Sequence, residues 1–142
     1  MQVETILQSK GTTVYTVEAG APLSEAVRLL NAHKIGAVVV VDAKGKVAGI
    51  LSERDIVRRL ESDPAKLLAS PVRSAMTTKV ITATRAHAVA DLMELMTRHR
   101  IRHIPVVEGN TLVGIVSIGD VVKRKIEEAE QEALALKEYI AS

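Results

Sequence analysis

Gly49-Ile50-Leu51-Ser52-Glu53-Arg54-Asp55 and Gly114-Ile115-Val116-Ser117-Ile118-Gly119-Asp120 are two copies of one pattern, Gly-Ile-x-Ser-x-x-Asp, at an offset of 65 residues. Upstream of these copies, residues 14–35 align without a gap with residues 80–101 at an offset of 66. A long period that occurs only twice indicates two similar small units packed together rather than a solenoid. Candidate sites are therefore expected in pairs.

The Ser and Asp of this motif stand where an apolar strand runs into a charged, helix-like segment. Ser is a natural N-cap for such a helix, and Asp in the first turn favours the helix dipole by about 0.3–1 kcal/mol. A helix start also offers backbone N–H groups to a phosphate, beside a hydroxyl and a carboxylate that can bind sugar oxygens. Because both residue types return in both copies, we expect Ser52, Asp55, Ser117 and Asp120 to bind a ligand as well as to cap helices.

The repeat, the apolar strands at 35–40 and 101–107, and the two motif copies together resemble the CBS domain, and the pair resembles a tandem CBS (Bateman) module. The resemblance covers roughly residues 3–60 and 72–124. It implies an α/β (α+β) fold of two pseudo-symmetric β-α-β-β-α repeats packed through their sheets. Members of this family are regulatory domains that commonly bind AMP, ADP, ATP or S-adenosylmethionine. Some bind NAD-type nucleotides, and others bind nothing known.

The resemblance also implies two clefts, each built from the strands of one repeat and the Ser and Asp of the other. The first cleft would contain Val14, Ile35, Gly36, Ala37, Ser117 and Asp120. The second would contain Ser52, Arg54, Asp55, Thr78, Val80, Ile101, Arg102, His103, Ile104 and Pro105. In each cleft the carboxylate would accept short charge-assisted hydrogen bonds from the two adjacent ribose hydroxyls. Aliphatic side chains would enclose the base.

Phosphate binding requires cations, and the two clefts differ in them. Arg102-His103 in the second repeat corresponds to Gly36-Ala37 in the first, and Arg54 in the first motif corresponds to Gly119 in the second. We therefore expect the cleft of Asp55 to suit a phosphate-bearing ligand. The other cleft should be more neutral, weaker or empty.

The chain divides into a first repeat over residues 1–60, a linker over 61–71, a second repeat over 72–124 and a helical extension over 125–142. Strands are expected at 12–17, 36–41 and 46–51 in the first repeat and at 79–83, 104–107 and 111–116 in the second. Helices are expected from about residue 21, over 53–60 and over about 86–99, on the basis of apolar periodicity and start signals. The linker, which contains Pro64 and Pro71, is expected to be a short connector without a strong period.

Past the second motif, apolar residues recur every three or four positions, which predicts a long amphipathic helix. They are Val121, Val122, Ile126, Ala129, Ala133, Leu136 and Ile140. The distal half of this helix would have little of its own domain to cover. We expect it to pack on the equivalent helix of a partner in a homodimer, or to cap the edge of the module; the alternative is a helix lying along its own domain.

Composition excludes several classes of function. The 142 residues are 47% hydrophobic, enough for a core, and they contain no Cys, which excludes disulfides and thiol catalysis. No apolar run approaches the ~20 residues of a membrane span, and residues 1–10 lack a signal-peptide core, so a soluble cytoplasmic protein without a membrane partner is expected. The net charge of +2 does not by itself indicate nucleic-acid binding.

Three other activities are weighed against ligand sensing. His99 and His103 are four residues apart, but a helix-to-strand change between them separates the rings, so no metal site is expected. Neither motif serine has a convincing general base, so we expect no enzyme and no catalytic cofactor. Nucleic-acid binding would rest on the basic cluster at 98–102 alone, without an aromatic platform. The remaining alternative is a ligand-free dimerisation or protein-interaction module; we favour a sensor of AMP, ADP or ATP levels.

Overall fold

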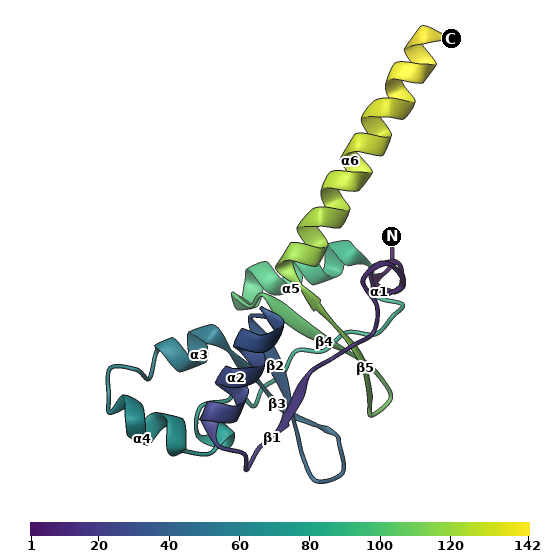
Figure 1. Ribbon diagram of the computed structural model, residues 1–142. Coiled ribbons are helices and arrows are strands. Elements are labelled where there is room, and N and C mark those ends of the chain that lie inside the picture. Colours follow the sequence, from purple (N-terminus) through teal and green to yellow (C-terminus); the bar gives the residue numbers. More distant parts are fainter.

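The computed structural model describes residues 1–142 and shows two α/β units from which a long helix projects (Figure 1). The first unit contains β1 (Thr16–Glu18), α2 (Leu23–His33), β2 (Ala37–Val41), β3 (Val47–Ser52), α3 (Glu53–Val57), α4 (Pro64–Ala69) and the short 3-10 helix η1 (Val72–Ser74). The second contains α1 (Val3–Lys10), α5 (Val89–His99), β4 (His103–Glu108), β5 (Thr111–Ser117) and α6 (Ile118–Ala141).

Each unit is built on a small sheet with the same register. β2 pairs in parallel with β1 and antiparallel with β3, where Val39 lies opposite Ile50. In the second unit β4 pairs antiparallel with β5, and Pro105 lies opposite Ile115. The expected strand over 79–83 is not formed: only Ala83 reaches β4, through a single parallel bridge to Val106. Further upstream, Thr77 makes an isolated antiparallel bridge with Ile50 of β3 instead.

Each unit has its own core of 11 buried residues, made of one face of the sheet and the apolar sides of its helices. Val38 and Val40 face the first core, so Val39 between them points to the other side of the sheet. Val39 is nevertheless fully buried, and its counterpart Pro105 is buried as well. The outer faces of the two sheets therefore cover one another, which confirms the predicted contact between units through their sheets.

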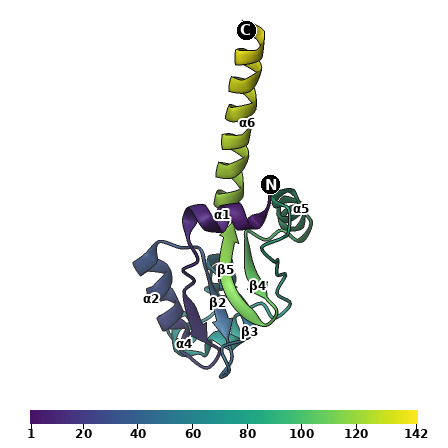
Figure 2. The ribbon, with the colours of Figure 1, turned by 90° about the vertical axis from the view of Figure 1, so that its right-hand side faces the viewer.

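The N-terminal helix belongs to the core of the second unit, although its residues precede the first repeat. Val3, Ile6 and Leu7 of α1 are buried in the second core. The backbone N–H of Val3 donates to the carbonyl of His87 at 2.9 Å. In Figure 2, α1 lies across the end of β5, at the base of α6. The sequence pattern had predicted no element over these residues.

The segment around Val72, which follows the first repeat in the sequence, packs on the first unit as α1 packs on the second. The backbone N–H of Val72 donates to the carbonyl of Ala21 at 2.8 Å, the equivalent of the bond from Val3 to His87. The preceding linker is not a short connector, because it contains α4, and Leu67 of this helix is buried in the first core. Asp63 starts α4 by accepting from two backbone N–H groups, and Pro64 stands in its first turn, where no donor is needed.

The segments that begin at Val3 and at Val72 differ in length. Val3 and Val72 are equivalent and are 69 residues apart, whereas equivalent residues of the strands that follow are only 66 apart. The segment that begins at Val3 is therefore three residues longer than the segment that begins at Val72. The extra residues are taken up by α1, which runs as a helix to Lys10, whereas the chain after Ala75 is extended. This difference breaks the symmetry of the two motif sites.

The long C-terminal helix is confirmed, and it does not lie along its own domain. Only its first turns pack on the second unit, where Val121 is fully buried. From residue 129 onward every side chain is exposed, and the helix extends away from both units (Figure 1). None of the helices combines the length and the apolarity that crossing a bilayer requires.

Candidate functional site

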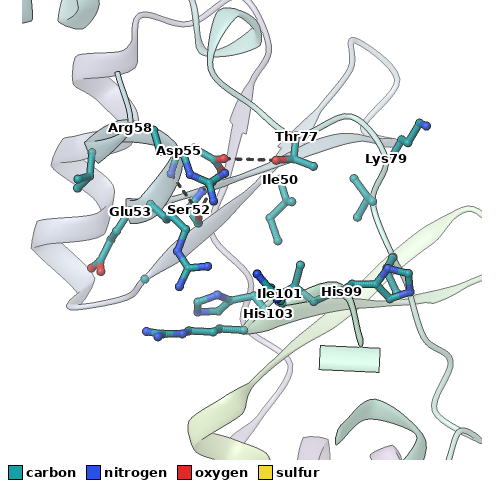
Figure 3. A pocket seen from close by; sticks show the side chains of 17 residues that line it. Ile50, Ser52, Glu53, Asp55, Arg58, Thr77, Lys79, His99, Ile101 and His103 are labelled. Carbon is teal, nitrogen blue, oxygen red and sulfur yellow. Dashed lines mark hydrogen bonds between the residues drawn. The ribbon is translucent and has the colours of Figure 1, made fainter. Parts of the chain in front are cut away.

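A cavity of about 850 Å³ lies between the two units, beside the first motif. Its walls come from the start of α3 in the first unit, from the extended chain after η1, and from the end of α5 with the start of β4 (Figure 3). The lining residues are Gly36, Ile50, Ser52, Glu53, Arg54, Asp55, Val57, Arg58, Thr77, Lys79, Val80, Ile81, His99, Arg100, Ile101, Arg102 and His103.

The Ser and Asp of each motif cap a helix reciprocally. The backbone N–H of Asp55 donates to Ser52 Oγ, and the backbone N–H of Ser52 donates to Asp55 Oδ2 at 2.8 Å. Ser117 and Asp120 repeat this capping box at the start of α6. Both residue types therefore have a structural role in both units, so their repetition alone does not identify a ligand site. The large cavity lies beside only the first of the two motifs.

Asp55 is 7% exposed, and one of its carboxylate oxygens has capacity to spare. Oδ2 accepts both bonds from Ser52, from the backbone N–H and from Oγ at 3.0 Å. Oδ1 accepts only a long hydrogen bond of 3.4 Å from Thr77 Oγ1 (Figure 3). A carboxylate oxygen has two lone pairs, so Oδ1 can accept from a hydroxyl of a bound molecule.

The cavity is rich in positive charge. Five side chains that are cationic at neutral pH line it, against the two carboxylates of Glu53 and Asp55. These cations are Arg54, Arg58, Lys79, Arg100 and Arg102. A concave, partly buried wall of one charge sign attracts ligands of the opposite sign. The site is therefore suited to an anion.

The backbone conformation at the end of α5 places Arg100 in the wall of the cavity. Arg100 closes the helix in the left-handed region with φ 53°, as Lys34 closes α2 with φ 52°. Such a conformation is unfavourable for a side chain with a Cβ, and its occurrence at the same place in both units reflects the repeated turn from helix to strand. The turn directs the chain from α5 into Ile101 and Arg102, both of which line the cavity.

His103 and Gly36 face each other inside the cavity. A Cβ added to Gly36 would lie 3.1 Å from His103 Cε1, so the glycine provides the space that the imidazole occupies. Burial lowers the pKa of His103, more than the nearby Glu53 carboxylate raises it. His103 is therefore a neutral hydrogen-bonding group at pH 7, and the fixed charge comes from the arginines and Lys79.

The remaining wall is aliphatic and comes from both units. It consists of Ile50, Val57, Val80, Ile81 and Ile101. Neither tyrosine of the chain lines the cavity, and Tyr15 stacks on His33 instead, with ring centroids 3.6 Å apart. A flat ring bound here would be enclosed by methyl groups.

The second motif is closed by the chain's own lysine. Lys10 Nζ donates to Asp120 Oδ2 at 2.7 Å and to the carbonyl of Ile115 at 2.9 Å. Burial raises the pKa of Asp120, but the hydrogen bonds from Lys10 and Ser117 outweigh this effect, so the pKa lies below its ordinary value. The hollow beside Asp120 measures only about 80 Å³. The residue equivalent to Lys10 in the other copy is Lys79, which lines the large cavity.

The structure brings together half of the residues predicted from sequence. Those that line the cavity are Gly36, Ser52, Arg54, Asp55, Val80, Ile101, Arg102 and His103. Those outside it are Val14, Ile35, Ala37, Thr78, Ile104, Pro105, Ser117 and Asp120. Ile104 and Pro105 are buried, and Ala37 is buried at the start of β2.

Gly36, which was expected in the cleft of Asp120, lines the cavity of Asp55 and not the hollow beside Asp120. The carbonyl of Gly36 accepts from the backbone N–H of Glu53 at 3.0 Å, because Ala37 pairs with Ser52 in the antiparallel sheet. Gly36 is therefore beside the motif of its own repeat. The second repeat has the same register, with the carbonyl of Arg102 accepting from the backbone N–H of Ile118 at 2.8 Å, yet Arg102 and His103 line the cavity of Asp55, the motif residue of the other repeat.

Sequence reasoning missed nine lining residues. Most of them lie within a few positions of residues that were predicted, such as Arg58 after the first motif and Arg100 within the basic cluster. Lys79 and Thr77 had no pattern of their own. Their signal was the correspondence of residues 3–10 with 72–79, in which only Val3 with Val72 and Lys10 with Lys79 are identical.

The profile of the CBS domain matches residues 10–62 and 72–127. The mitochondrial CBS domain-containing protein CBSX3 of Arabidopsis thaliana is 39% identical over 120 residues, which are 82% of this chain and 58% of that protein's length. The crystal structure of the CBS-domain containing protein ATU1752 from Agrobacterium tumefaciens is similar with a TM-score of 0.83 at 46% identity, over 87% of this chain and 92% of that one. The CBS domain pair of protein MJ0100, in complex with 5′-methylthioadenosine and S-adenosyl-L-methionine, has a TM-score of 0.80 at 27% identity, over 90% of this chain and 98% of that one.

Proposed function

The chain belongs to the CBS domain family as a tandem pair, and from this premise we propose that it is a regulatory module that binds an adenine nucleotide such as AMP, ADP or ATP in the cavity beside Asp55. The observation that carries the proposal is the combination, in one cavity, of a carboxylate oxygen with free capacity and five cationic side chains. The MJ0100 pair, which was solved with two adenosyl ligands, supports an adenosine-containing ligand.

Each part of a nucleotide has a matching wall. Asp55 Oδ1 can accept from a ribose hydroxyl, and the aliphatic side chains from both units can enclose the base. Phosphate would lie toward Arg54 and Arg102, since arginine presents paired donors that fit phosphate oxygens. Burying the base against aliphatic groups contributes a few kcal/mol at about 25 cal/mol per Å².

We propose one nucleotide per chain. Lys10 already occupies the carboxylate of Asp120 and leaves about 80 Å³ beside it, far less than the cavity at Asp55. This agrees with the asymmetry expected from the distribution of cations in the sequence. The cause differs in part, because a lysine of the N-terminal helix closes the second site.

Binding would signal through the relative position of the two units. The cavity is lined by α3 of the first unit and by the α5–β4 turn of the second, so a ligand contacts both at once. Such a ligand favours the arrangement to which it binds more tightly, by no more than its difference in affinity. Both motif serines are tied into capping boxes, so we propose that the chain acts by binding and not by catalysis.

Calorimetric titration with AMP, ADP, ATP, S-adenosylmethionine and NAD, at two salt concentrations, tests the proposal. We expect saturable binding of an adenine nucleotide with one site per chain, weaker at higher salt because the cavity is cationic. Absence of binding by every one of these compounds would refute the proposal and favour a ligand-free interaction module.

Substitutions locate the site. Asp55→Asn should abolish or strongly weaken binding, whereas Asp120→Asn, the same change at the equivalent position of the other motif, should leave it unchanged. Arg102→Ala should weaken AMP binding about tenfold or more and adenosine binding little, since a hydrogen bond to a charged group contributes roughly 1.5–3 kcal/mol. Equal effects of the two Asp substitutions would place the ligand elsewhere.

A further inference from the structure

The free part of α6 presents a continuous apolar stripe that nothing in its own chain covers. Val122, Ile126, Leu136 and Ile140 are 45%, 53%, 59% and 74% exposed. The helix docks on the second unit through another side, on which Val121 is fully buried and Arg124 contacts Met1. A partner can therefore cover the stripe without displacing α6 from its own domain.

The spacing of the stripe is that of a coiled coil. Its members are Val122, Ile126, Ala129, Ala133, Leu136 and Ile140, which alternate by four and three residues without interruption. This is the 3.5-residue period at which two helices keep the same face together as they supercoil. In heptad terms, residues 126, 133 and 140 are a positions, and residues 122, 129 and 136 are d positions. Isoleucine at a with leucine at d favours two strands, and Ile126, Leu136 and Ile140 follow this rule, while the other stripe positions hold valine or alanine.

The charges beside the stripe match a second copy in parallel orientation. In a parallel pair, each g position lies opposite the e position five residues further along the other helix. Lys125 at g then meets Glu130 of the second copy, and Glu132 at g meets Lys137 of the second copy. Each pairing occurs twice in the symmetric dimer, and all four pairs are of opposite charge.

An antiparallel pair would oppose like charges. With the stripes fully overlapped, g positions face g positions and e positions face e positions. Glu132 would then lie opposite Glu132 of the second copy, and Glu130 opposite Glu130. Like charges in this position disfavour the arrangement, so the sequence selects orientation as well as partner.

We propose that a second copy of this chain covers the stripe, through a parallel two-stranded coiled coil over residues 122–140. This dimer is independent of nucleotide binding. Because α6 begins at the Ser117–Asp120 cap of the second unit, the coiled coil sets the two second units side by side at its base.

Sedimentation equilibrium of the full chain, without nucleotide, tests the proposal. We expect a concentration-dependent dimer that Leu136→Gln weakens at least tenfold. Leu134→Gln is the matched control, because Leu134 is 58% exposed and lies on the same helix but off the stripe. A chain that stays monomeric at about 100 µM, or a dimer that both substitutions affect equally, would overturn the proposal.

Charge reversal tests the orientation. Glu132→Lys and Lys137→Glu should each weaken the dimer about tenfold, since two attractive pairs become repulsive. Neither residue has an oppositely charged neighbour three or four positions away on its own helix, so the effect is between helices. The double substitution restores opposite charges only in the parallel dimer and should recover the affinity. Failure of the double variant to recover would refute the parallel arrangement.

Discussion

Replacing Lys10 by Met tests the contact that closes the second motif. The substitution keeps the aliphatic stem of the side chain and removes the ammonium group that donates to Asp120 and to the Ile115 carbonyl. The side chains of Lys10 and Asp120 are 31% and 22% exposed, so solvent screens the pair only in part.

The expected loss follows from the two bonds. A partly exposed ion pair contributes about 0.2–1 kcal/mol, and the charged hydrogen bond to a carbonyl adds about 1 kcal/mol after solvent screening. Lys10→Met should therefore lower the free energy of unfolding by about 1–2 kcal/mol at pH 7. For a chain of this size that corresponds to a melting temperature roughly 3–8 °C lower.

The loss should also depend on pH. The pKa of Asp120 is lowered in the folded chain, so its ionised form adds stability above the unfolded-state pKa and this contribution disappears as the pH falls through the folded value. The difference between the natural chain and the Lys10→Met variant in urea unfolding should therefore shrink as the pH is lowered below about 4, down to the part that the bond to the Ile115 carbonyl contributes.

The control for this experiment is Lys44→Met in the turn between β2 and β3, where the side chain makes no ion pair or hydrogen bond. If Lys10→Met lost no more stability than Lys44→Met at pH 7, the closure of the second motif by Lys10 would be refuted. A loss that stayed constant down to pH 3 would show that Asp120 is not the partner.

Three further outcomes are expected. Gly49→Ala should lower the free energy of unfolding, measured in urea, by about 2–3 kcal/mol, because the added methyl group would lie 2.8 Å from the Thr77 carbonyl oxygen. Gly114→Ala should lower it by only about 1 kcal/mol, because the methyl group meets only side-chain atoms of Leu7. Equal losses would contradict this. Burial lowers the pKa of His103, so the unfolded chain binds its proton more readily, and between pH 7.5 and about 5 the natural chain should lose stability relative to His103→Gln. Parallel pH curves would exclude His103 as the cause. Lys34→Gly should raise stability by about 0.5–1 kcal/mol because Lys34 ends α2 at φ 52°, and thermal unfolding at or below that of the natural chain would reject this account.

The doubled architecture could be predicted from sequence because period and register are local properties. The two motif copies fixed the order of strands and helices, and the alternation of apolar residues after Asp120 predicted α6. The helix α4 was missed because only Leu67 of its six residues is buried, which leaves no apolar period to detect.

The cationic character of the candidate site could be predicted from the sequence, but about half of its lining residues could not. Arg54 and Arg102 were identified because basic residues are visible in the sequence, and both line the cavity. Gly36 was expected in the cleft of Asp120, but it lies in the cavity of Asp55, between Glu53 of its own repeat and His103 of the other, and no sequence pattern shows this contact. The bond from Lys10 to Asp120 joins residues 110 positions apart, and neither residue carries a pattern that points to the other.

The place of α1 in the second core sets an order of events during synthesis. The first unit has all its core residues once the chain has reached Ala75. The second core needs Val3, Ile6 and Leu7, which are made before any of its other members, together with Val121, the last of them to be made. At about 5–20 residues per second, the second core stays incomplete for roughly 6–23 s after these side chains are made. Folding of the second unit is therefore a long-range closure, and the nascent N-terminal segment is the part of this chain most in need of protection by a chaperone.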